Sequence, residues 1–229
     1  MMSLVAERLE QVEQRIARAA GRAGRTRADV TLIAVTKTFP VEIVNEAYAL
    51  GLREFGENYV QEFERKKPLL ANLPEAHFHL IGHLQSNKTR IAAELFHSVE
   101  TVDSEKLARR LNESRESTGQ PPLEVMIEVK LSGEESKYGA DPRLLPALTE
   151  SIRSCPHLRL TGLMTMPPWN DDPEQTRPYF RRLAELAREH GLKHLSMGMS
   201  HDFEAAIEEG ATHIRVGRGL FGPRAKRED

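Results

Sequence analysis

The sequence predicts an α/β protein with a single closed (β/α)8 barrel of the TIM type, preceded by one extra N-terminal helix. Eight short apolar runs suited to β-strands occur along the 229 residues, and most are followed by a stretch with helical periodicity. Eight alternating units favour a closed parallel barrel over an open doubly wound sheet. No linker, low-complexity stretch or shift in composition divides the chain, so residues 1–229 are interpreted as one domain.

A helix is predicted before any strand. Between Leu4 and Ala19, apolar residues recur at three- and four-residue spacing among charged residues, while Ser3 can cap the amino end and Gly21 can end the helix. The chain stops soon after its last predicted strand, which leaves little room for an eighth outer helix of normal length. We therefore expect the N-terminal helix to cover that side of the barrel.

The remaining elements alternate along the chain. The first strand, 30–36, is an apolar run rich in β-branched residues, and the helix that follows begins at a proline and stops at Gly51. Later helices begin at the Asp103-Ser104 cap or end at Gly191 and Gly210. The eight predicted strands are 30–36, 53–55, 78–81, 98–102, 123–131, 158–164, 194–197 and 213–216, and the helices between them are 40–50, 59–70, 87–95, 104–117, 144–154, 173–190 and 202–209.

Composition narrows the class of function. The 32 basic and 34 acidic residues nearly cancel, so net charge gives no support for a nucleic-acid or membrane-surface partner. A single cysteine, Cys155, excludes an intramolecular disulfide and fits a reducing compartment. There is no apolar signal-peptide core and no apolar run near the ~20 residues needed to cross a bilayer. We expect a cytoplasmic protein and, without an obvious exposed apolar face, a monomer.

Lys37 ends the first predicted strand, and barrels of this kind place their active sites at the carboxyl ends of the strands. A lysine at a strand end most often extends its ammonium group into solvent. A functional role requires the neutral amine, because only that form attacks a carbonyl group. The usual pKa of about 10.4 must then be lowered by burial or by a neighbouring cation, for which Arg215 and Lys137 are candidates.

A glycine-rich segment closes the last predicted strand. Residues 217–222 match the G-x-G-x-x-G fingerprint of dinucleotide-binding folds, but the seven residues after Gly222 are too few for the helix, strand and acidic residue of that fold. A plain turn leaving the barrel is the simplest alternative. Barrels often bind phosphate at the loops after strands seven and eight, and Ser200 follows strand seven. The turns at Ser200 and Gly217 therefore favour a phosphate site.

Strands one and eight are neighbours in a closed barrel, so Lys37 and the glycine-rich segment should meet. An amine beside a phosphate site predicts that the protein holds a phosphorylated carbonyl compound as an imine. A cofactor-binding protein and a Schiff-base aldolase acting on a sugar phosphate both fit this pattern.

Other polar and apolar residues give weaker signals. His77 and His79 could together bind a metal, but they lie at the start of strand three and not at its carboxyl end, so we expect no metal site. Asn58 ends strand two at the same rim as Lys37, where an amide that caps the next helix is the simplest interpretation. Met164 ends strand six and could form an apolar wall against one face of an aromatic ring.

Seven segments together resemble the pyridoxal-phosphate homeostasis proteins, a family of small proteins that bind pyridoxal phosphate (PLP) and are related to the barrel domain of alanine racemases. They come in the order and spacing of that family and cover nearly the whole chain. The segments are AVTK (34–37), GENYVQE (56–62), HLIGHLQSNK (79–88), GEESKYG (133–139), GLMTM (162–166), LSMGMSHD (195–202) and RVGRGLFG (215–222).

The resemblance implies that Lys37 carries PLP as a Schiff base and that Ser200 and the amides near Gly217 hold its phosphate. It also implies that Arg215 faces the pyridine nitrogen and disfavours protonation there, which weakens the ring as an electron sink. By resemblance, Asn58 and Met164 complete the cofactor site. The implied function is storage and delivery of PLP in vitamin B6 homeostasis, with apo-enzymes that use PLP as recipients.

The sequence departs from the family pattern in strand five, where Glu128 and Lys130 replace the common Gln and Asn, and at Tyr138. Lys130 could add a cation or a second amine to the site. Racemases of the related class use a second acid/base, a tyrosine from a C-terminal domain of the partner subunit, and this chain has no such domain. We therefore expect little or no substrate-level catalysis, with a PLP-dependent amino-acid racemase of low activity as the alternative.

Overall fold

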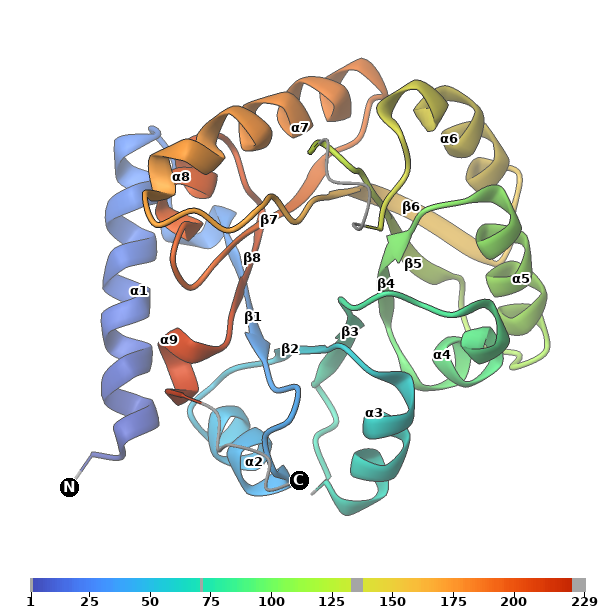
Figure 1. Cartoon of the computed structure of the whole chain (residues 1–229). Coiled ribbons are helices and arrows are strands. Elements are labelled where there is room, and N and C mark those ends of the chain that lie inside the picture. Colours follow the sequence, from blue (N-terminus) through green and yellow to red (C-terminus); the bar gives the residue numbers. More distant parts are fainter. Residues whose placement is uncertain (1, 71, 133–137, 224–229) are drawn as a thin grey trace.

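The computed structural model describes residues 2–70, 72–132 and 138–223, and it confirms the predicted barrel. Eight parallel strands form one closed sheet in sequence order, with β1 paired to both β2 and β8. Helices surround the sheet on its outer side (Figure 1). No helix within these ranges is long and apolar enough to span a bilayer.

The strands are short, as in most barrels of this kind, and the longer helices lie between them along the chain. The strands are β1 (Thr31–Val35), β2 (Glu54–Glu57), β3 (His77–Leu80), β4 (Ser98–Val102), β5 (Leu123–Glu128), β6 (Leu158–Met164), β7 (His194–Met199) and β8 (His213–Val216). The helices are α1 (Leu4–Arg22), α2 (Val41–Ala49), α3 (Val60–Lys66), α4 (Thr89–Leu95), α5 (Glu105–Glu116), α6 (Leu145–Arg153), α7 (Arg177–Glu189), α8 (Phe203–Glu208) and α9 (Arg218–Phe221).

Most predicted boundaries differ from the observed ones by one to four residues, and two differences bear on the barrel mouth. Strand β5 was predicted to reach residue 131 but ends at Glu128, because the returning chain forms an isolated bridge with Val129. Ala140 donates its N–H to Glu128 O, and Lys130 N donates to Ala140 O. No helix was predicted after Gly217, yet the single turn α9 begins at Arg218 and packs Phe221 against Phe39, with ring centroids 5.2 Å apart.

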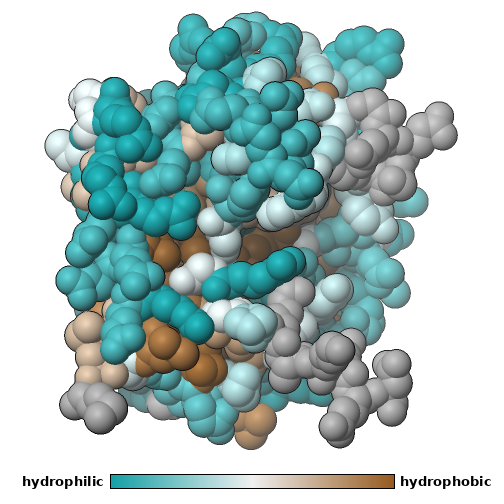
Figure 2. All heavy atoms as spheres, turned by 60° about the vertical axis from the view of Figure 1, so that its left-hand side comes forward, coloured by the Kyte–Doolittle hydropathy of each residue, from teal (hydrophilic) through white to brown (hydrophobic). Residues whose placement is uncertain are grey.

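Helix α1 covers the outer side of the barrel next to the last strand, as expected. Ser3 caps α1 by accepting a hydrogen bond from Ala6 N, and the helix lies alongside α8 and α9 (Figure 1). Arg15 and Arg22 of α1 pair with Glu204 and Glu208 of α8. The outward face of this region is mainly hydrophilic, with hydrophobic side chains in view only in restricted areas (Figure 2).

The barrel interior contains a charged network as well as apolar side chains. His79 binds two carboxylates, with Nδ1 2.9 Å from Glu100 Oε1 and Nε2 2.7 Å from Glu54 Oε2. Ser196 donates a 2.5 Å hydrogen bond to Glu100 and accepts one of 2.6 Å from Arg215. The network therefore runs from Glu54 at the amino end of the barrel to Arg215 near the carboxyl end. Its two cations, His79 and Arg215, balance its two carboxylates, Glu54 and Glu100.

Burial alone would lower the pKa of His79, but the hydrogen bonds to Glu100 and Glu54 outweigh it and raise this pKa to about 9. Burial would raise the pKa of Glu100, but the same bond to His79 lowers it to about 2. The imidazolium and the carboxylate are therefore both charged at neutral pH. His77 and His79, considered above as metal ligands, instead lie at the amino end of β3 bonded to Glu54.

We expect the His79 network to make the free energy of unfolding depend on pH. Because the folded-state pKa lies above the unfolded value, the stabilisation is complete below pH 6.5 and is lost as the pH rises toward 9, a change of roughly 3 kcal/mol from this residue. Urea unfolding from pH 6 to 9.5 measures it. The substitution His79→Gln should remove this part of the pH dependence of the unfolding free energy. The substitution His77→Gln, at an exposed position of the same strand, should leave it unchanged. Equal slopes in all three proteins would contradict the assignment.

Candidate ligand site at the barrel mouth

The carboxyl ends of all eight strands meet at one end of the barrel, which we call the barrel mouth. A residue with a functional or lining side chain, or a backbone amide, ends or follows each strand there, and four of these residues, Lys37, Asn58, Ser200 and Gly217, were predicted from the sequence as cofactor-binding. In strand order, the residues at the strand ends are Lys37, Asn58, His83, Asp103, Glu128, Met166, Ser200 and Gly217.

The turn that carries Lys37 is held on both sides by charged groups, of which Lys66 and Glu57 are buried and Glu62 is partly exposed. Before it, Lys66 Nζ donates to the carbonyl of Thr36 (3.0 Å) and to Glu57 Oε1 (2.7 Å), which also accepts the Thr36 hydroxyl (2.8 Å). After it, the Thr38 N–H donates to Glu62 Oε1 at 2.6 Å. These contacts hold the chain on either side of Lys37, which is itself half-buried.

The backbone of the Lys37 turn is also unusual. Thr38 has φ of +64°, a left-handed conformation that β-branched residues rarely adopt. Phe39 N closes the turn by donating to Thr36 O at 3.0 Å. A rare conformation of this kind persists only where its surroundings enforce it, and such positions are concentrated at functional sites.

The Ser200 hydroxyl and two backbone amides converge beside the Lys37 turn. Gly217 N and Gly219 N both donate to Ser200 Oγ, at 3.3 and 3.2 Å. A Cβ on Gly217 would lie 3.4 Å from Val35 O, two residues before Lys37. The last turn of the barrel therefore packs directly on the end of β1. Amides that share one hydroxyl acceptor are suited to an anion with several oxygens.

Arg215 and Met164 lie deeper in the barrel. Arg215 is 3% exposed and donates to Ser196 Oγ and to Thr165 O (2.9 Å), so its guanidinium is fixed from two strands. Met164 is completely buried and pairs in register with Glu128 on β5 and Ser196 on β7. Paired residues of parallel strands share one face of the sheet, and Ser196 belongs to the interior network, so all three face inward. Met166, two residues further along, lines the pocket at the mouth.

Several polar atoms at the mouth are buried without a hydrogen-bond partner among the described residues: Asn58 Oδ1, His83 Nδ1 and Glu128 Oε2. They follow or end three different strands at the same end of the barrel. The backbones that carry the first two are in close contact, because a Cβ on Gly82, next to His83, would lie 2.3 Å from the backbone O of Asn58. Buried polar groups are almost always paired in folded proteins, so a cluster of unpaired ones indicates a missing polar ligand.

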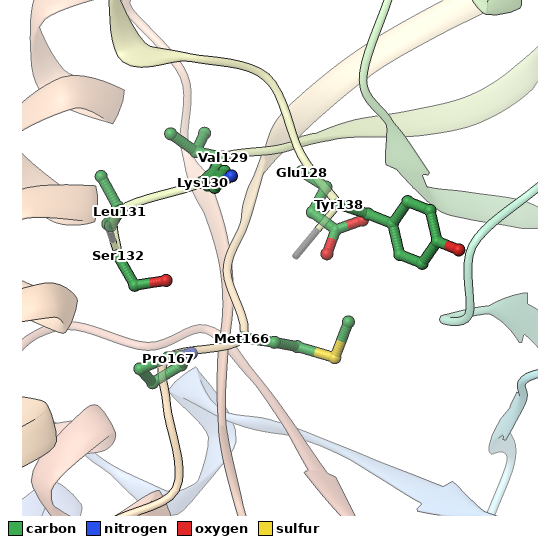
Figure 3. Close-up of a pocket in the computed structure, with 8 residues that line it drawn as sticks. All are labelled: Glu128, Val129, Lys130, Leu131, Ser132, Tyr138, Met166 and Pro167. Atoms are coloured by element: carbon green, nitrogen blue, oxygen red, sulfur yellow. The ribbon is translucent and has the colours of Figure 1, made fainter. Parts of the chain in front are cut away.

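A pocket of about 190 Å³ opens on the β5 side of the mouth (Figure 3). Its lining residues are Glu128, Val129, Lys130, Leu131, Ser132, Tyr138, Met166 and Pro167. Tyr138 stacks on His83, with centroids 3.7 Å apart, and so connects this pocket to the end of β3. Lys137, proposed from the sequence as a cation near Lys37, lies outside the described residues.

Sequence reasoning missed the residues that support Lys37: Glu57, Glu62 and Lys66. Two of them lie in the segment 56–62, whose resemblance was noted, but nothing in the sequence shows that their side chains reach residues 36–38. Within the described residues, no group of three or more His, Cys, Asp or Glu side chains has the arrangement of a metal site.

Comparison with known proteins agrees with this geometry. Residues 8–225 match the family model of the alanine racemase N-terminal domain. The chain is 51% identical over 225 residues to the pyridoxal phosphate homeostasis protein of Pseudomonas aeruginosa, covering 97% of each sequence.

Solved structures extend the comparison. PipY of Synechococcus elongatus, solved with PLP bound, is 39% identical, with a TM-score of 0.82 over 95% of this chain and 100% of that one. The alanine racemase of Corynebacterium glutamicum shares the fold at 19% identity, with a TM-score of 0.71 over 98% of this chain and 63% of that one.

The buried Lys66–Glu57 pair should be important for stability. Lys66→Met leaves the Glu57 carboxylate buried and unpaired, which we expect to lower the free energy of unfolding by about 3–5 kcal/mol. Amide exchange at residues 36–39 should also become faster, because Thr36 O loses one of its two donors and keeps only Phe39 N. Urea unfolding and hydrogen exchange measure the two effects.

Two matched variants test this interpretation. Lys106→Met, on the exposed surface of α5, should change stability by less than about 0.5 kcal/mol. Adding Glu57→Gln to Lys66→Met should recover part of the loss, because a neutral amide needs no counter-charge. If Lys66→Met is as stable as the surface control, the pair does not support the turn.

Proposed function

Because the chain belongs to the pyridoxal phosphate homeostasis protein family, we propose that it binds PLP at the barrel mouth through Lys37 and serves to store and deliver this cofactor. The observation that carries the proposal is the close approach of Gly217 to Val35, which brings the turn of Ser200, Gly217 and Gly219 against the end of β1, two residues before Lys37. An amine and an anion-binding turn side by side match the two functional ends of PLP, its aldehyde and its phosphate.

The residues of the mouth fit this cofactor. PLP, when bound, supplies an aldehyde that bonds to amines and an aromatic ring that withdraws electrons from an attached carbon. In the proposed site Lys37 provides the amine for the covalent bond. The amides of Gly217 and Gly219 and the Ser200 hydroxyl hold the phosphate. The unpaired Oδ1 of Asn58 is available to a polar group of the ligand, and Met164 lies below as an apolar floor.

Arg215 is proposed to face the ring nitrogen. A guanidinium group stays charged and can only donate hydrogen bonds, so it disfavours a proton on a nitrogen that it contacts. Its bonds to Ser196 and Thr165 hold it in place, and Glu100 balances its charge through Ser196. An unprotonated ring is a weak electron sink, which suits binding and release better than demanding carbanion chemistry. Apo-enzymes that need PLP are the proposed recipients.

The position of the covalent bond can be tested directly. Protein incubated with PLP should absorb visible light, and borohydride should fix the cofactor mass to the peptide that contains Lys37. Lys37→Ala should lose both signals, because no other amine is proposed to reach the aldehyde. Lys130→Ala, the matched change across the mouth, should keep both. Labelling of Lys130 in the wild-type protein would refute the assignment, and a colourless protein would favour a lysine aldolase without cofactor.

The phosphate site predicts a difference between PLP and pyridoxal, which has no phosphate. Ser200→Asp places a carboxylate where the two amides converge, so affinity for PLP should fall about 10- to 100-fold, the range for losing a hydrogen-bonded charge. Affinity for pyridoxal should change little, and Ser200→Ala should give a smaller loss for PLP. Titration of both ligands measures this. An equal loss for the two ligands would place the phosphate elsewhere.

A further inference from the structure

Glu128 is a buried carboxyl group at the barrel mouth to which the proposed function assigns no role. Its side chain is 3% exposed, and its Oε2 atom is buried without a hydrogen-bond partner among the described residues. The carboxyl group points into the small pocket on the β5 side, toward the space between Tyr138 and Met166 (Figure 3). A buried carboxyl oxygen left unpaired at the edge of an open pocket indicates that its partner is a ligand.

The barrel topology places Glu128 across the mouth from Lys37. Strand β5, which Glu128 ends, is four strands away from β1 in a closed ring of eight, so the two strand ends face each other (Figure 1). A ligand that is attached at Lys37 and extends over the mouth therefore turns one edge toward Glu128. In PLP with its phosphate at Ser200, the oxygen available on another edge is that of the ring hydroxyl.

The groups around Glu128 set its charge. Arg215 on β8 favours the carboxylate, whereas Asp103, just after β4, disfavours it, and Lys130 and Tyr138 line the same pocket. The residues of β6 nearest to it, Met164 and Met166, carry no charge. Burial is the largest influence and raises the pKa of Glu128 to about 7. Both the neutral acid and the anion are therefore populated near neutral pH.

We propose that Glu128 contacts the ligand in the barrel mouth and, as a neutral carboxylic acid, donates a hydrogen bond to an oxygen of an anionic ligand. This inference rests on the proposed function, because it takes PLP as the ligand. Loss of the proton turns the donor into an anion that faces another anion in a poorly solvated site, so the ligand is held less tightly. Glu128 is thus a ligand-contacting residue that makes affinity depend on pH.

The dissociation constant of PLP, measured from pH 6 to 9, tests the proposal. Groups of PLP titrate in the same range, so the wild-type protein is compared with Glu128→Gln, which keeps the shape and the donor of the neutral acid but cannot ionise. The dissociation constant of the wild-type protein divided by that of Glu128→Gln should rise about tenfold from pH 6 to pH 9, a coupling typical of linked sites.

Glu124→Gln is the matched control, since Glu124 is on the same strand at the far end of the barrel and pairs with Arg159. A ratio that stays constant, or a control that changes equally, overturns the proposal.

A second measurement needs no variant. In wild-type protein with ¹³C-labelled glutamate, the carboxyl of Glu128 should titrate at higher pH when PLP is bound. If PLP binds the protein with neutral Glu128 more tightly, bound PLP must stabilise the neutral form of Glu128 by the same factor. An unchanged or lowered titration point overturns the role of Glu128 even if the variant fails to fold. Failure of the wild-type protein to bind PLP at any pH would instead overturn the proposed function.

Discussion

Closure of the sheet between β1 and β8 is the constraint on which the candidate site depends. Four residue pairs join these strands, from Thr31 with His213 to Ala34 with Val216. This register brings the first strand end, which carries Lys37, against the last turn of the barrel at Gly217, where a side chain would press on Val35. An amine and an anion-binding turn from opposite ends of the chain become neighbours only because the parallel sheet closes on itself.

The charged groups inside the barrel explain how such a site stays rigid. One network ties Arg215 through Ser196 to Glu100 and His79, and another ties Lys66 and Glu57 to the Lys37 turn. Buried charges are costly unless each has a well-placed partner, so these side chains tolerate few alternative positions. The same demand for partners makes the unpaired atoms of Asn58 and Glu128 informative, because both lie at the barrel mouth, where a polar ligand can reach them.

The barrel fold by itself does not specify a function, since many unrelated activities share it. What distinguishes this chain is the combination of a lysine on a fixed turn, two amides meeting at Ser200, and a buried arginine beneath them. Storage of a reactive aldehyde needs a reversible covalent bond and an anchoring phosphate site, and it needs no substrate-gripping second domain. In the proposed function Lys37 and the turn of Ser200 and Gly217 supply the first two, and in the further proposal Glu128 makes the strength of binding depend on pH.

The sequence by itself determined the order and type of the elements, the closed barrel, and the strand ends that carry Lys37, Ser200 and Gly217, because these follow from periodicity, capping residues and glycine turns. It could not give the early end of β5, since the Val129–Ala140 bridge depends on where a returning segment packs. Nor could it show that Lys66 reaches Thr36, or that His79 lies between two carboxylates. Side-chain partners on different strands are set by register and burial, which exist only once the sheet has closed. The charge state of His79 follows from its two carboxylate partners, and that of Glu128 follows mainly from its burial.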